Sequence, residues 1–333
     1  MKFKNHFKNK NILVIGGTGT IGAGLTETLL REAKPKVLRV LSNDENALFQ
    51  MKYRLRAYEN IRYLIGDVRD KSRMRWAVRA VDTVFHSAAL KHVALSEYNP
   101  FDAVETNVLG TQNVIEACLT ERVKKMVFIS TDKAVCPTST MGATKLLAER
   151  LVRDASAYRG AAPTQFCCVR FGNVLGSRGS LVPLISRQVR DGGPVTITDS
   201  RATRFFMSVD EAVRLVLNAA ADSKGGEIYI LKMPSIRIRE LMEVVIEHFA
   251  PKFGYSADEI RIEEIGLRKG EKLHEELMTE EESFAARQIN GMFKIKTPRP
   301  DKKQQEYSSE KNRFLNKREI KKLLVQASVL EKE

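Results

Sequence analysis

Residues 12–22, I-L-V-I-G-G-T-G-T-I-G, constrain the fold most strongly, because an apolar run typical of a buried strand leads directly into closely spaced glycines. The glycines fit G-x-G-x-x-G through Gly17, Gly19 and Gly22, or G-x-x-G-x-x-G when the pattern starts at Gly16. Such a turn lets a pyrophosphate approach backbone N–H groups at the start of a helix, where the helix dipole favours an anion. The segment therefore predicts a strand, a dinucleotide-binding turn and a helix.

Short apolar runs alternate with helical patterns through the first half of the chain, which is typical of a parallel sheet with helices on both faces. The expected strands are residues 12–16, 37–41, 61–65, 83–87, 125–130 and 165–171. The expected helices are residues 20–32, 44–57, 71–80, 99–121 and 140–158, followed later by 209–221 and 237–249. The pattern predicts an α/β fold, a Rossmann doubly wound parallel sheet with a smaller C-terminal lobe that binds the substrate.

The sequence changes character after Phe171, where turn-rich stretches replace the regular alternation. The expected divisions are an NAD(P)-binding domain over 1–171, a substrate-binding lobe interwoven with it over 172–297, and a basic tail over 298–333. A second βα unit is expected to end near Lys296, and the polar sequence from Thr297 on is expected to be mobile. An apolar stripe over residues 318–330 predicts a terminal helix that docks on the protein or binds a partner.

The net charge of +14 raises nucleic acid and anionic membranes as partners, but much of the excess lies at the two ends of the chain. Residues 1–10 contain four lysines, and residues 299–333 contain ten Lys and Arg against six Asp and Glu. We interpret these ends as solvated and expect no nucleic-acid partner. Because no apolar run approaches the roughly 18 residues that span a bilayer, we expect a cytoplasmic protein with no membrane span. The spacing of the four cysteines suits neither a metal nor a disulfide framework, and no metal is expected.

Residues that follow two further strands fit a bound dinucleotide. Asp67 and Val68 come after the third strand, where a carboxylate can accept a hydrogen bond from adenine. Ala88 and Ala89 end the fourth strand, where small side chains leave room for the cofactor. Both positions lie at the edge of the sheet where such folds bind nucleotides.

The end of the second strand bears on the choice of cofactor. An acidic residue there favours the ribose of NAD, and an arginine favours the 2′-phosphate of NADP. The sequence Ser42-Asn43-Asp44 has an amide at the central position and its carboxylate one residue later. NAD and NADP therefore both remain candidates.

Residues 130–145, S-T-D-K-A-V-C-P-T-S-T-M-G-A-T-K, begin at the carboxyl end of the fifth expected strand and place acid–base groups there. Further motifs are H-S-A-A-L-K-H-V (86–93), N-V-L-G-T-Q-N-V (107–114), V-R-F-G-N-V-L-G-S-R-G-S (169–180), T-R-F-F (203–206) and G-E-K-L-H-E-E (270–276). As a set, these motifs resemble the UDP-N-acetylglucosamine 4,6-dehydratases of the CapD-like polysaccharide-biosynthesis family, which are extended short-chain dehydrogenases/reductases. The resemblance spans about residues 11–290 in family order.

The resemblance implies a reaction on a UDP-N-acetylhexosamine that leaves a tightly bound NAD(P) unchanged overall. C4 of the sugar is oxidised by hydride transfer, water is lost across C5 and C6, and the hydride returns to C6. The temporary ketone at C4 acidifies the C5 proton and makes the C6 hydroxyl a leaving group, so the protein must supply an acid and a base. The block of motifs thus implies a 4-keto-6-deoxy product, and we expect a homo-oligomeric enzyme.

By resemblance, Lys133 is the expected base at C5 and Asp132 the expected acid for the departing C6 oxygen. A lysine is a base near neutral pH only when its pKa is lowered, and we expect the charge of Lys145 to do this for Lys133. Lys145 is also expected to bond the nicotinamide ribose. Met141 occupies the position of the usual tyrosine, and its thioether cannot exchange a proton. Members of the family with methionine there remain dehydratases, so Asp132, with Thr131 as a relay, is the candidate to take the C4 proton.

The remaining expected contacts divide between cofactor and substrate. Cofactor contacts are expected at Gly16, Gly17, Thr18, Gly19, Thr20, Ile21, Gly22, Ser42, Asn43, Asp44, Asp67, Val68, Ala88, Ala89, Lys91, Asn107 and Lys145. Substrate contacts are expected at Lys91, Asn173, Arg204, Glu271 and Lys272. Cationic side chains in this set suit a diphosphate, because charge-assisted hydrogen bonds to its oxygens are strong. His86 is expected to be a packed strand residue.

Two other classes of protein remain open. An NAD(P)-dependent nucleotide-sugar epimerase or reductase of the same fold would more often carry the tyrosine, and it provides no reason for Lys133. A non-enzymatic dinucleotide sensor or scaffold would use the basic tail as a binding arm and would bind NAD(P) without turnover.

Overall fold

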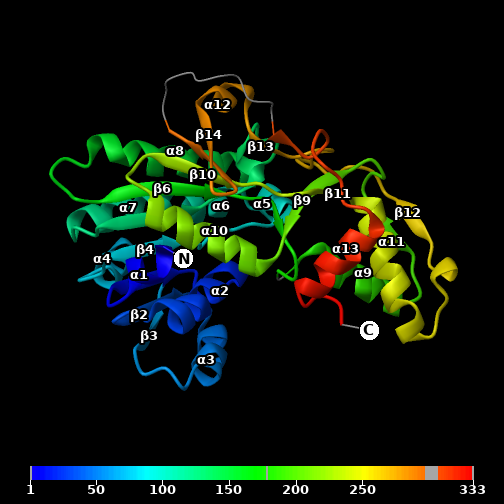
Figure 1. Cartoon of the computed structure of the whole chain (residues 1–333), viewed down its shortest axis with the longest axis horizontal. Coiled ribbons are helices and arrows are strands. Elements are labelled where there is room, and N and C mark those ends of the chain that lie inside the picture. The colour runs from blue at the N-terminus through cyan, green and yellow to red at the C-terminus, as the bar shows by residue number, and fades with distance from the viewer. Residues whose placement is uncertain (1, 178, 297–306, 332–333) are drawn as a thin grey trace.

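The centre of the molecule is a nine-stranded sheet, seen in a computed structural model that describes residues 2–177, 179–296 and 307–331 (Figure 1). The strand order is β14-β15-β10-β6-β5-β4-β1-β2-β3, in which β10 to β3 are parallel and β14 and β15 form an antiparallel hairpin at one edge. The strands are β1 (Asn11–Ile15), β2 (Val37–Ser42), β3 (Ile61–Ile65), β4 (Thr83–His86), β5 (Lys125–Ile129), β6 (Gln165–Arg170), β10 (Glu227–Leu231), β14 (Ala286–Ile289) and β15 (Met292–Ile295). The order 3-2-1-4-5-6 within this sheet is that of a doubly wound fold, which confirms the predicted class.

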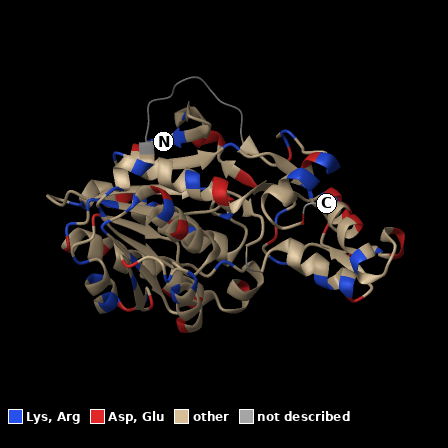
Figure 2. Cartoon of the chain, turned by 60° about the horizontal axis from the view of Figure 1, so that its bottom comes forward, with Lys and Arg blue, Asp and Glu red and all other residues tan. Residues whose placement is uncertain are grey.

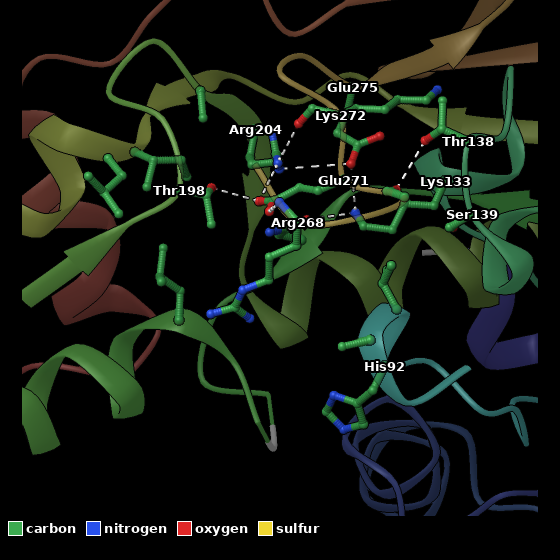
Figure 3. Close-up of a pocket in the computed structure, with 18 of the residues that line it drawn as sticks. His92, Lys133, Thr138, Ser139, Thr198, Arg204, Arg268, Glu271, Lys272 and Glu275 are labelled. Carbon is green, nitrogen blue, oxygen red and sulfur yellow. Dashed lines mark hydrogen bonds and ion pairs between the residues drawn. The ribbon is translucent and has the colours of Figure 1, made fainter. Parts of the chain in front are cut away.

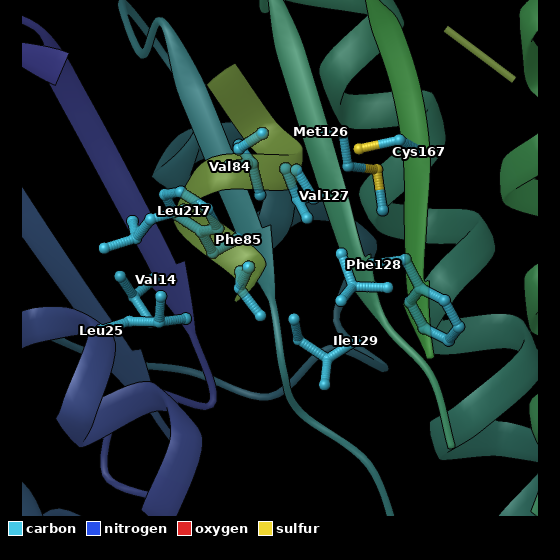
Figure 4. Packing of buried hydrophobic residues seen from close by; sticks show 14 of the residues in the cluster. Val14, Leu25, Val84, Phe85, Met126, Val127, Phe128, Ile129, Cys167 and Leu217 are labelled. Atoms are coloured by element: carbon cyan, nitrogen blue, oxygen red, sulfur yellow. The ribbon is translucent and has the colours of Figure 1, made fainter. Parts of the chain in front are cut away.

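Helices cover both faces of the sheet, because each crossover between parallel strands returns through a helix. α1, α2 and α10 pack together on one face, and α4, α7 and α8 pack on the other. The helices of this domain are α1 (Lys2–Phe7), α2 (Thr20–Thr28), α3 (Glu45–Arg54), α4 (Lys71–Ala77), α7 (Gly110–Thr120), α8 (Thr140–Tyr158) and α10 (Val209–Asp222). In the core, Val14, Phe85 and Val127 of three neighbouring strands belong to one cluster with Leu25 of α2 and Leu217 of α10 (Figure 4).

A smaller lobe with a hydrophobic core of its own lies to one side of the sheet (Figure 1). Its elements are α9 (Leu181–Arg190), α11 (Ile238–Phe249), α13 (Lys317–Gln326), the sheet of β7 (Asn173–Val174), β9 (Thr203–Met207) and β11 (Ser235–Arg237), and the pair β8 (Val195–Ile197) and β12 (Ile262–Glu264). Other elements of the same half of the chain, α10, β10 and the β14–β15 hairpin, belong to the main core. The C-terminal half therefore passes repeatedly between the two cores.

One expected helix is divided in the structure, and one expected unit is followed by a hairpin. The helix expected over 99–121 is divided into α6 (Pro100–Val104), a π-helical turn over Glu105–Leu109, and α7, and it is preceded by α5 (Val93–Tyr98). Pro100 fits the start of α6 because the first N–H groups of a helix have no partner within it. The unit expected to end near Lys296 consists of β13 (Glu276–Met278) and α12 (Glu280–Ala285), so the expected strand and helix are present, and the antiparallel β14–β15 hairpin follows them.

The C-terminal segment is ordered where the structure describes it. Of the segment expected to be mobile from Thr297 on, residues 297–306 lie outside the described residues. From Tyr307 on, the expectation of mobility is wrong, because β16 (Tyr307–Ser308) pairs with β13 (Glu276–Met278). The Tyr307 hydroxyl accepts a hydrogen bond from the Met233 nitrogen at 2.6 Å and donates one to the Met233 carbonyl at 2.8 Å.

The predicted terminal helix is confirmed as α13, which packs against α11. Ile320 and Leu324 on its inner face are fully buried, and Leu330 beyond its end is also buried. The stripe of apolar residues in an otherwise basic sequence thus docks the helix on the smaller lobe.

The N-terminus is packed as well. Phe3 and Phe7 of α1 are fully buried, whereas Lys4 and Lys8 are exposed, so these lysines are solvated as expected and only the apolar face of this end is packed. Lys and Arg are interspersed with Asp and Glu over both lobes (Figure 2). Among the described residues, no helix is long and apolar enough to cross a bilayer, and no cluster of His, Cys, Asp and Glu is arranged to hold a metal ion.

The docking of α13 can be tested by removing a buried side chain. Leu324→Ala should lower the free energy of unfolding by about 2–5 kcal/mol, as buried leucines do elsewhere. Lys322→Ala on the exposed face of the same helix should change it by about 0.5 kcal/mol or less. Urea unfolding followed by circular dichroism measures both, and equal small effects would mean that α13 is not docked.

Candidate active site

Residues 16–22 form a tight turn between β1 and α2. Gly16 has a φ of +74°, and a Cβ there would lie 2.5 Å from the backbone nitrogen of Ala88. A Cβ at Gly22 would lie 2.3 Å from the carbonyl oxygen of Gly16, and α2 begins after Gly19. The close approach at both ends of the turn favours the G-x-x-G-x-x-G register, and the turn leads into the N-terminus of α2, the end of a helix that favours an anion.

The residues after β2 and β3 continue this cradle. Thr18 Oγ1 and Ser42 Oγ lie 2.7 Å apart, so the turn is tied to the end of β2. Asn43 Nδ2 donates to Asp67 Oδ2 at 3.4 Å, and Arg69 pairs with the same oxygen at 2.9 Å. The Arg69 guanidinium holds the pKa of Asp67 below its ordinary value, so this side chain is an ionised acceptor at the place where adenine is expected.

Three further expected cofactor contacts are buried or held by hydrogen bonds. Asp44 Oδ1 accepts a hydrogen bond from the first turn of α3 at 2.9 Å and caps that helix. Val68 is buried. Asn107 Oδ1 accepts from the Leu90 nitrogen at 2.8 Å, and its Nδ2 donates to Thr144 Oγ1 at 3.0 Å. Asn107 therefore fastens the loop after β4, with Ala88 and Lys91, to α8.

Lys145 is a buried lysine that points from α8 to the end of β5. Its Nζ donates to the Ile129 carbonyl at 2.6 Å and lies 3.9 Å from the centre of the Phe128 ring. Burial lowers the pKa of Lys145 to about 8, so its charge responds to a ligand near neutral pH. His86 is fully buried in β4 as predicted, with Nε2 3.0 Å from Thr111 Oγ1, and burial lowers its pKa to about 3.

Met141 lies buried in the first turn of α8, after residues 130–138, which are called the catalytic segment because the expected acid–base residues lie there. Ser139 caps this helix by accepting from the Gly142 nitrogen at 3.1 Å. A Cβ at Gly142 would lie 2.3 Å from the Lys133 carbonyl oxygen, so the helix start and the catalytic segment are in close contact. With a thioether at this position, any proton transfer must come from other side chains.

Lys133 lies between two buried carboxylates. Its Nζ is 3.0 Å from Asp132 Oδ1 and 3.5 Å from Asn173 Oδ1. It is also 3.2 Å from Glu275 Oε1 (Figure 3). Thr131 Oγ1 donates to Asp132 Oδ1 at 2.9 Å. The other two oxygens, Asp132 Oδ2 and Glu275 Oε2, are buried and have no hydrogen-bond partner in the described part of the chain.

The electrostatic surroundings of Lys133 differ from the expectation. Burial alone would lower its pKa, but the carboxylates of Asp132 and Glu275 outweigh burial and hold the pKa of Lys133 above its ordinary value. Arg204 opposes them from nearby, whereas Lys145 is bonded to a backbone carbonyl. The prediction that Lys145 lowers the pKa of Lys133 is therefore wrong, and Lys133 is a cation in the substrate-free site.

A cavity of about 330 Å³ opens beside Lys133, between the main sheet and the smaller lobe. Four of the five expected substrate contacts line it: Asn173, Arg204, Glu271 and Lys272. Lys91 is not among the described residues of the wall, although His92 to Ala94 are. Part of the wall is apolar and includes Leu181, Leu184, Ile197, Ile238 and Met242. This combination suits a ligand with both a flat apolar part and a charged part.

Arg204 is fixed within the cavity wall. It donates to the carbonyl oxygens of Lys272 at 2.8 Å and Leu273 at 2.9 Å, and it pairs with Glu271 at 3.3 Å. Lys272 in turn donates to the Val135 carbonyl at 2.7 Å. These contacts fasten the G-E-K-L-H-E-E segment to the catalytic segment across the cavity.

Two residues at this cavity were not predicted from the sequence. Glu275 belongs to the G-E-K-L-H-E-E motif, but an acidic letter in that motif was the only signal, because its partners lie in a distant segment. Arg268 precedes the motif, and its guanidinium reaches into the cavity (Figure 3). Its charge adds a further candidate for contact with a diphosphate.

A buried ion cluster supports the site from behind. Arg170 on β6 donates to Glu149 on α8, and to Glu282 at the start of α12 at 2.7 Å. Glu149 also accepts from Ser130 Oγ at 2.6 Å. Because Arg170 donates to the Leu277 carbonyl at 2.9 Å as well, the cluster connects the catalytic segment with β13.

Residues 12–297 match the model of the polysaccharide biosynthesis protein family. The match covers most of the chain and agrees with the doubly wound sheet, the glycine turn and the buried lysine of α8. The chain belongs to this family, and its fold is that of the extended short-chain dehydrogenases/reductases.

Three curated relatives show what the chain is similar to. A protein of Methanocaldococcus jannaschii, described as an uncharacterized membrane protein, is 54% identical over 329 residues, 98% of each chain. The UDP-N-acetylglucosamine 4,6-dehydratase (inverting) of Campylobacter jejuni is 41% identical over 290 residues, 87% of this chain and 83% of the relative. The UDP-glucose 4-epimerase of Rickettsia typhi is 35% identical over 344 residues, 98% of each chain.

Two solved structures share the fold. Pen from Bacillus thuringiensis is 46% identical with a TM-score of 0.93, covering 97% of this chain and 99% of Pen. The dTDP-glucose 4,6-dehydratase DesIV from Streptomyces venezuelae, solved with NAD bound, is 25% identical with a TM-score of 0.70, covering 79% and 86%. The resemblance inferred from the motifs is thus confirmed at the level of family and fold.

The burial of Lys145 makes a pH-dependent contribution to stability. Between about pH 8 and about pH 10.5 the unfolded chain binds this proton and the folded protein does not, so the free energy of unfolding rises with pH in this window. Lys145→Met lacks the contribution. The wild type should therefore gain about 2 kcal/mol more than the variant between about pH 7.5 and about pH 10, measured by urea unfolding. A constant difference between the two proteins would contradict the lowered pKa.

Proposed function

We propose that the protein is a nucleotide-sugar 4,6-dehydratase that converts UDP-N-acetylglucosamine into a UDP-4-keto-6-deoxy-N-acetylhexosamine. The observation that carries the proposal is the Asp132–Lys133 pair beside the cavity. Loss of water needs a base that removes the C5 proton and an acid that protonates the C6 oxygen, and hydride transfer at C4 needs neither of these two steps. The 41% identity to a dehydratase of this substrate supports the choice of sugar.

The glycine turn fits the cofactor that this reaction needs. A Cβ at Gly16 would clash with the backbone of Ala88, and one at Gly22 would clash with the Gly16 carbonyl, so only glycine keeps this turn tight. The turn leads into the N-terminus of α2, the end of a helix that favours an anion. We infer that either NAD or NADP lies there, with Asp67 toward the adenine and Lys145 toward the nicotinamide ribose. The NAD in DesIV supports this inference. When bound, the nicotinamide accepts a hydride from C4 of the sugar and later returns it.

The side chains around Lys133 would perform the proton transfers. Asp132, oriented by the Thr131 hydroxyl, takes the proton of the C4 hydroxyl and then gives it to the departing C6 oxygen. Lys133 takes the proton of C5 and returns it when the elimination is complete. Since Lys133 is a cation in the substrate-free site, its own proton must leave before it can act as this base.

A 4-epimerase is the second candidate, because one relative that matches over 98% of its length carries that activity in its name. An epimerase removes and returns a hydride at C4 alone. The Lys133 cluster would then have no proton to transfer at C5 or C6, and Met141 would leave that chemistry without its usual tyrosine. These considerations favour the dehydratase.

The reaction can be tested with UDP-N-acetylglucosamine carrying deuterium at C4. We expect loss of one water and appearance of the deuterium at C6. In a parallel reaction of the unlabelled sugar in deuterium oxide, we expect uptake of solvent deuterium at C5. Mass and proton spectra measure both. Deuterium that stays at C4 in a dehydrated product would contradict hydride return to C6. An isomer of unchanged mass would identify an epimerase, and an unchanged sugar with bound NAD(P) would support a non-enzymatic dinucleotide-binding protein.

The assigned roles predict different effects at two neighbouring positions. Lys133→Ala should lower the rate of water loss by about 1,000-fold or more, because the C5 base is gone. Met141→Leu should stay within about tenfold of the wild type, because the swap conserves volume and Met141 transfers no proton. Lys322→Ala is the control for loss of a lysine charge far from the site. Equal losses in the first two variants would contradict these roles.

A further inference from the structure

Glu275 faces the cavity, yet one of its carboxylate oxygens has no partner. The side chain is 2% exposed and lies in the cavity wall beside Lys133. Its Oε1 is 3.2 Å from Lys133 Nζ and 3.8 Å from Arg204 Nε, whereas Oε2 is buried without a hydrogen bond from any described residue. A buried carboxylate oxygen without a hydrogen bond raises the free energy of the folded protein. At a cavity wall this free energy is lowered when the oxygen takes up a proton or accepts a hydrogen bond from a ligand.

The charges around Glu275 come from three segments of the chain. Lys133 and Asp132 lie on the catalytic segment, Arg204 on β9, and Lys272 on the segment of Glu275 itself. Burial raises the pKa of Glu275, the charge of Lys133 opposes this, and the nearby Asp132 carboxylate adds to the rise. Glu275 is thus a carboxylate that readily takes up a proton, and the nearest proton is on Lys133.

The backbone of Glu275 is held firmly while its carboxyl group is left available. Its nitrogen donates to Ser309 Oγ at 2.9 Å, and the Ser309 nitrogen donates to its carbonyl oxygen at 2.8 Å. Ser309 Oγ also lies 2.8 Å from Thr203 Oγ1 on β9. The carboxyl group is therefore placed by its main chain, and it can change protonation without moving.

We propose that Glu275 takes the ammonium proton of Lys133 when the sugar fills the cavity, and that this transfer makes Lys133 the base for C5. The inference rests on the proposed dehydratase function. A bound sugar excludes water from the cluster, and in dry surroundings an ion pair is favoured to pass to its neutral forms. Glu275 does not touch the reacting atoms of the sugar. It acts through Lys133, whose protonation state it sets, and is therefore a positioning residue.

The protons balance through one turnover. Oxidation of C4 sends the hydride to NAD(P) and the O4 proton to Asp132, and elimination sends the C5 proton to neutral Lys133. The C6–O bond breaks as Asp132 returns its proton to that oxygen, so one water leaves. Lys133 then returns its proton to C5 as the hydride adds to C6. Glu275 keeps the original ammonium proton throughout, so the cluster ends as it began.

Glu275→Gln tests this role, because an amide has nearly the same shape and cannot take the proton. Oxidation at C4 needs only Asp132, so mixing the variant with UDP-N-acetylglucosamine should reduce its bound cofactor, seen by absorbance. Water loss should fall by about 100-fold or more with little change in KM. It should recover as pH rises, since Lys133 can then lose its proton to solvent. In the wild type water loss should not show this rise.

Two further variants separate this role from a structural one. Glu276→Gln removes the neighbouring carboxylate on β13 and should behave as the wild type. Glu275→Asp keeps a carboxyl group and should restore part of the water loss without accumulation of reduced cofactor. Loss of both C4 oxidation and water loss in Glu275→Gln, or water loss at the wild-type rate, would overturn the proposal.

The same experiment separates failure of this role from failure of the proposed function. If the wild type releases no water from UDP-N-acetylglucosamine, the dehydratase proposal fails and the role of Glu275 fails with it. If the wild type releases water and Glu275→Gln does so equally well, the dehydratase proposal stands and the role of Glu275 alone is overturned.

Discussion

The buried guanidinium of Arg170 is the interaction on which the arrangement of the site depends. It binds Glu149 and Glu282, which come from helices on opposite sides of it in the sequence, and it also binds the Leu277 carbonyl. A charge this deeply buried is tolerated only when carboxylates and carbonyls surround it. Since Glu149 also bonds Ser130, the same cluster sets the catalytic segment and β13 at a fixed separation. The cavity and its facing carboxylates follow from that separation.

The parts of the molecule that rest on local patterns could be predicted from the sequence. The glycine turn at residues 16–22 and the pair of Asp132 and Lys133 each occupy one short stretch after a strand, so spacing and residue type locate them. The expected roles of Asp132 and Lys133 come from the resemblance to the family. Glu275 and Ser309 could not be found in this way. They meet the catalytic segment only because β13 and β16 pair beside it, and single-sequence patterns carry no information about which distant segments pair.

The charges that act on Lys133 are decided by distance in the folded structure and not by distance along the sequence. Lys145 is near in sequence, but a side chain on a helix leans toward the helix N-terminus, and this orientation takes Lys145 to the Ile129 carbonyl. The groups that control Lys133 are instead Asp132 beside it and Glu275 from the far end of the chain. The predicted direction of the pKa shift was reversed for this reason. Because Lys133 lies between two carboxylates, it can become a base when one of them takes its proton. A neighbouring cation such as Lys145 is not required for this.

The pairing of β16 with β13 determines when, during translation, the surroundings of Glu275 can form. Ser309 holds the backbone of Glu275 and is synthesised after it, and long after the glycine turn of residues 16–22. Domains assemble from the N-terminus during translation, so the dinucleotide-binding turn can form while the ribosome is still adding residues. The cluster of Lys133 and Glu275 is completed only after Ser309 has emerged. A nascent chain can thus acquire its nucleotide site well before it acquires the means to use it.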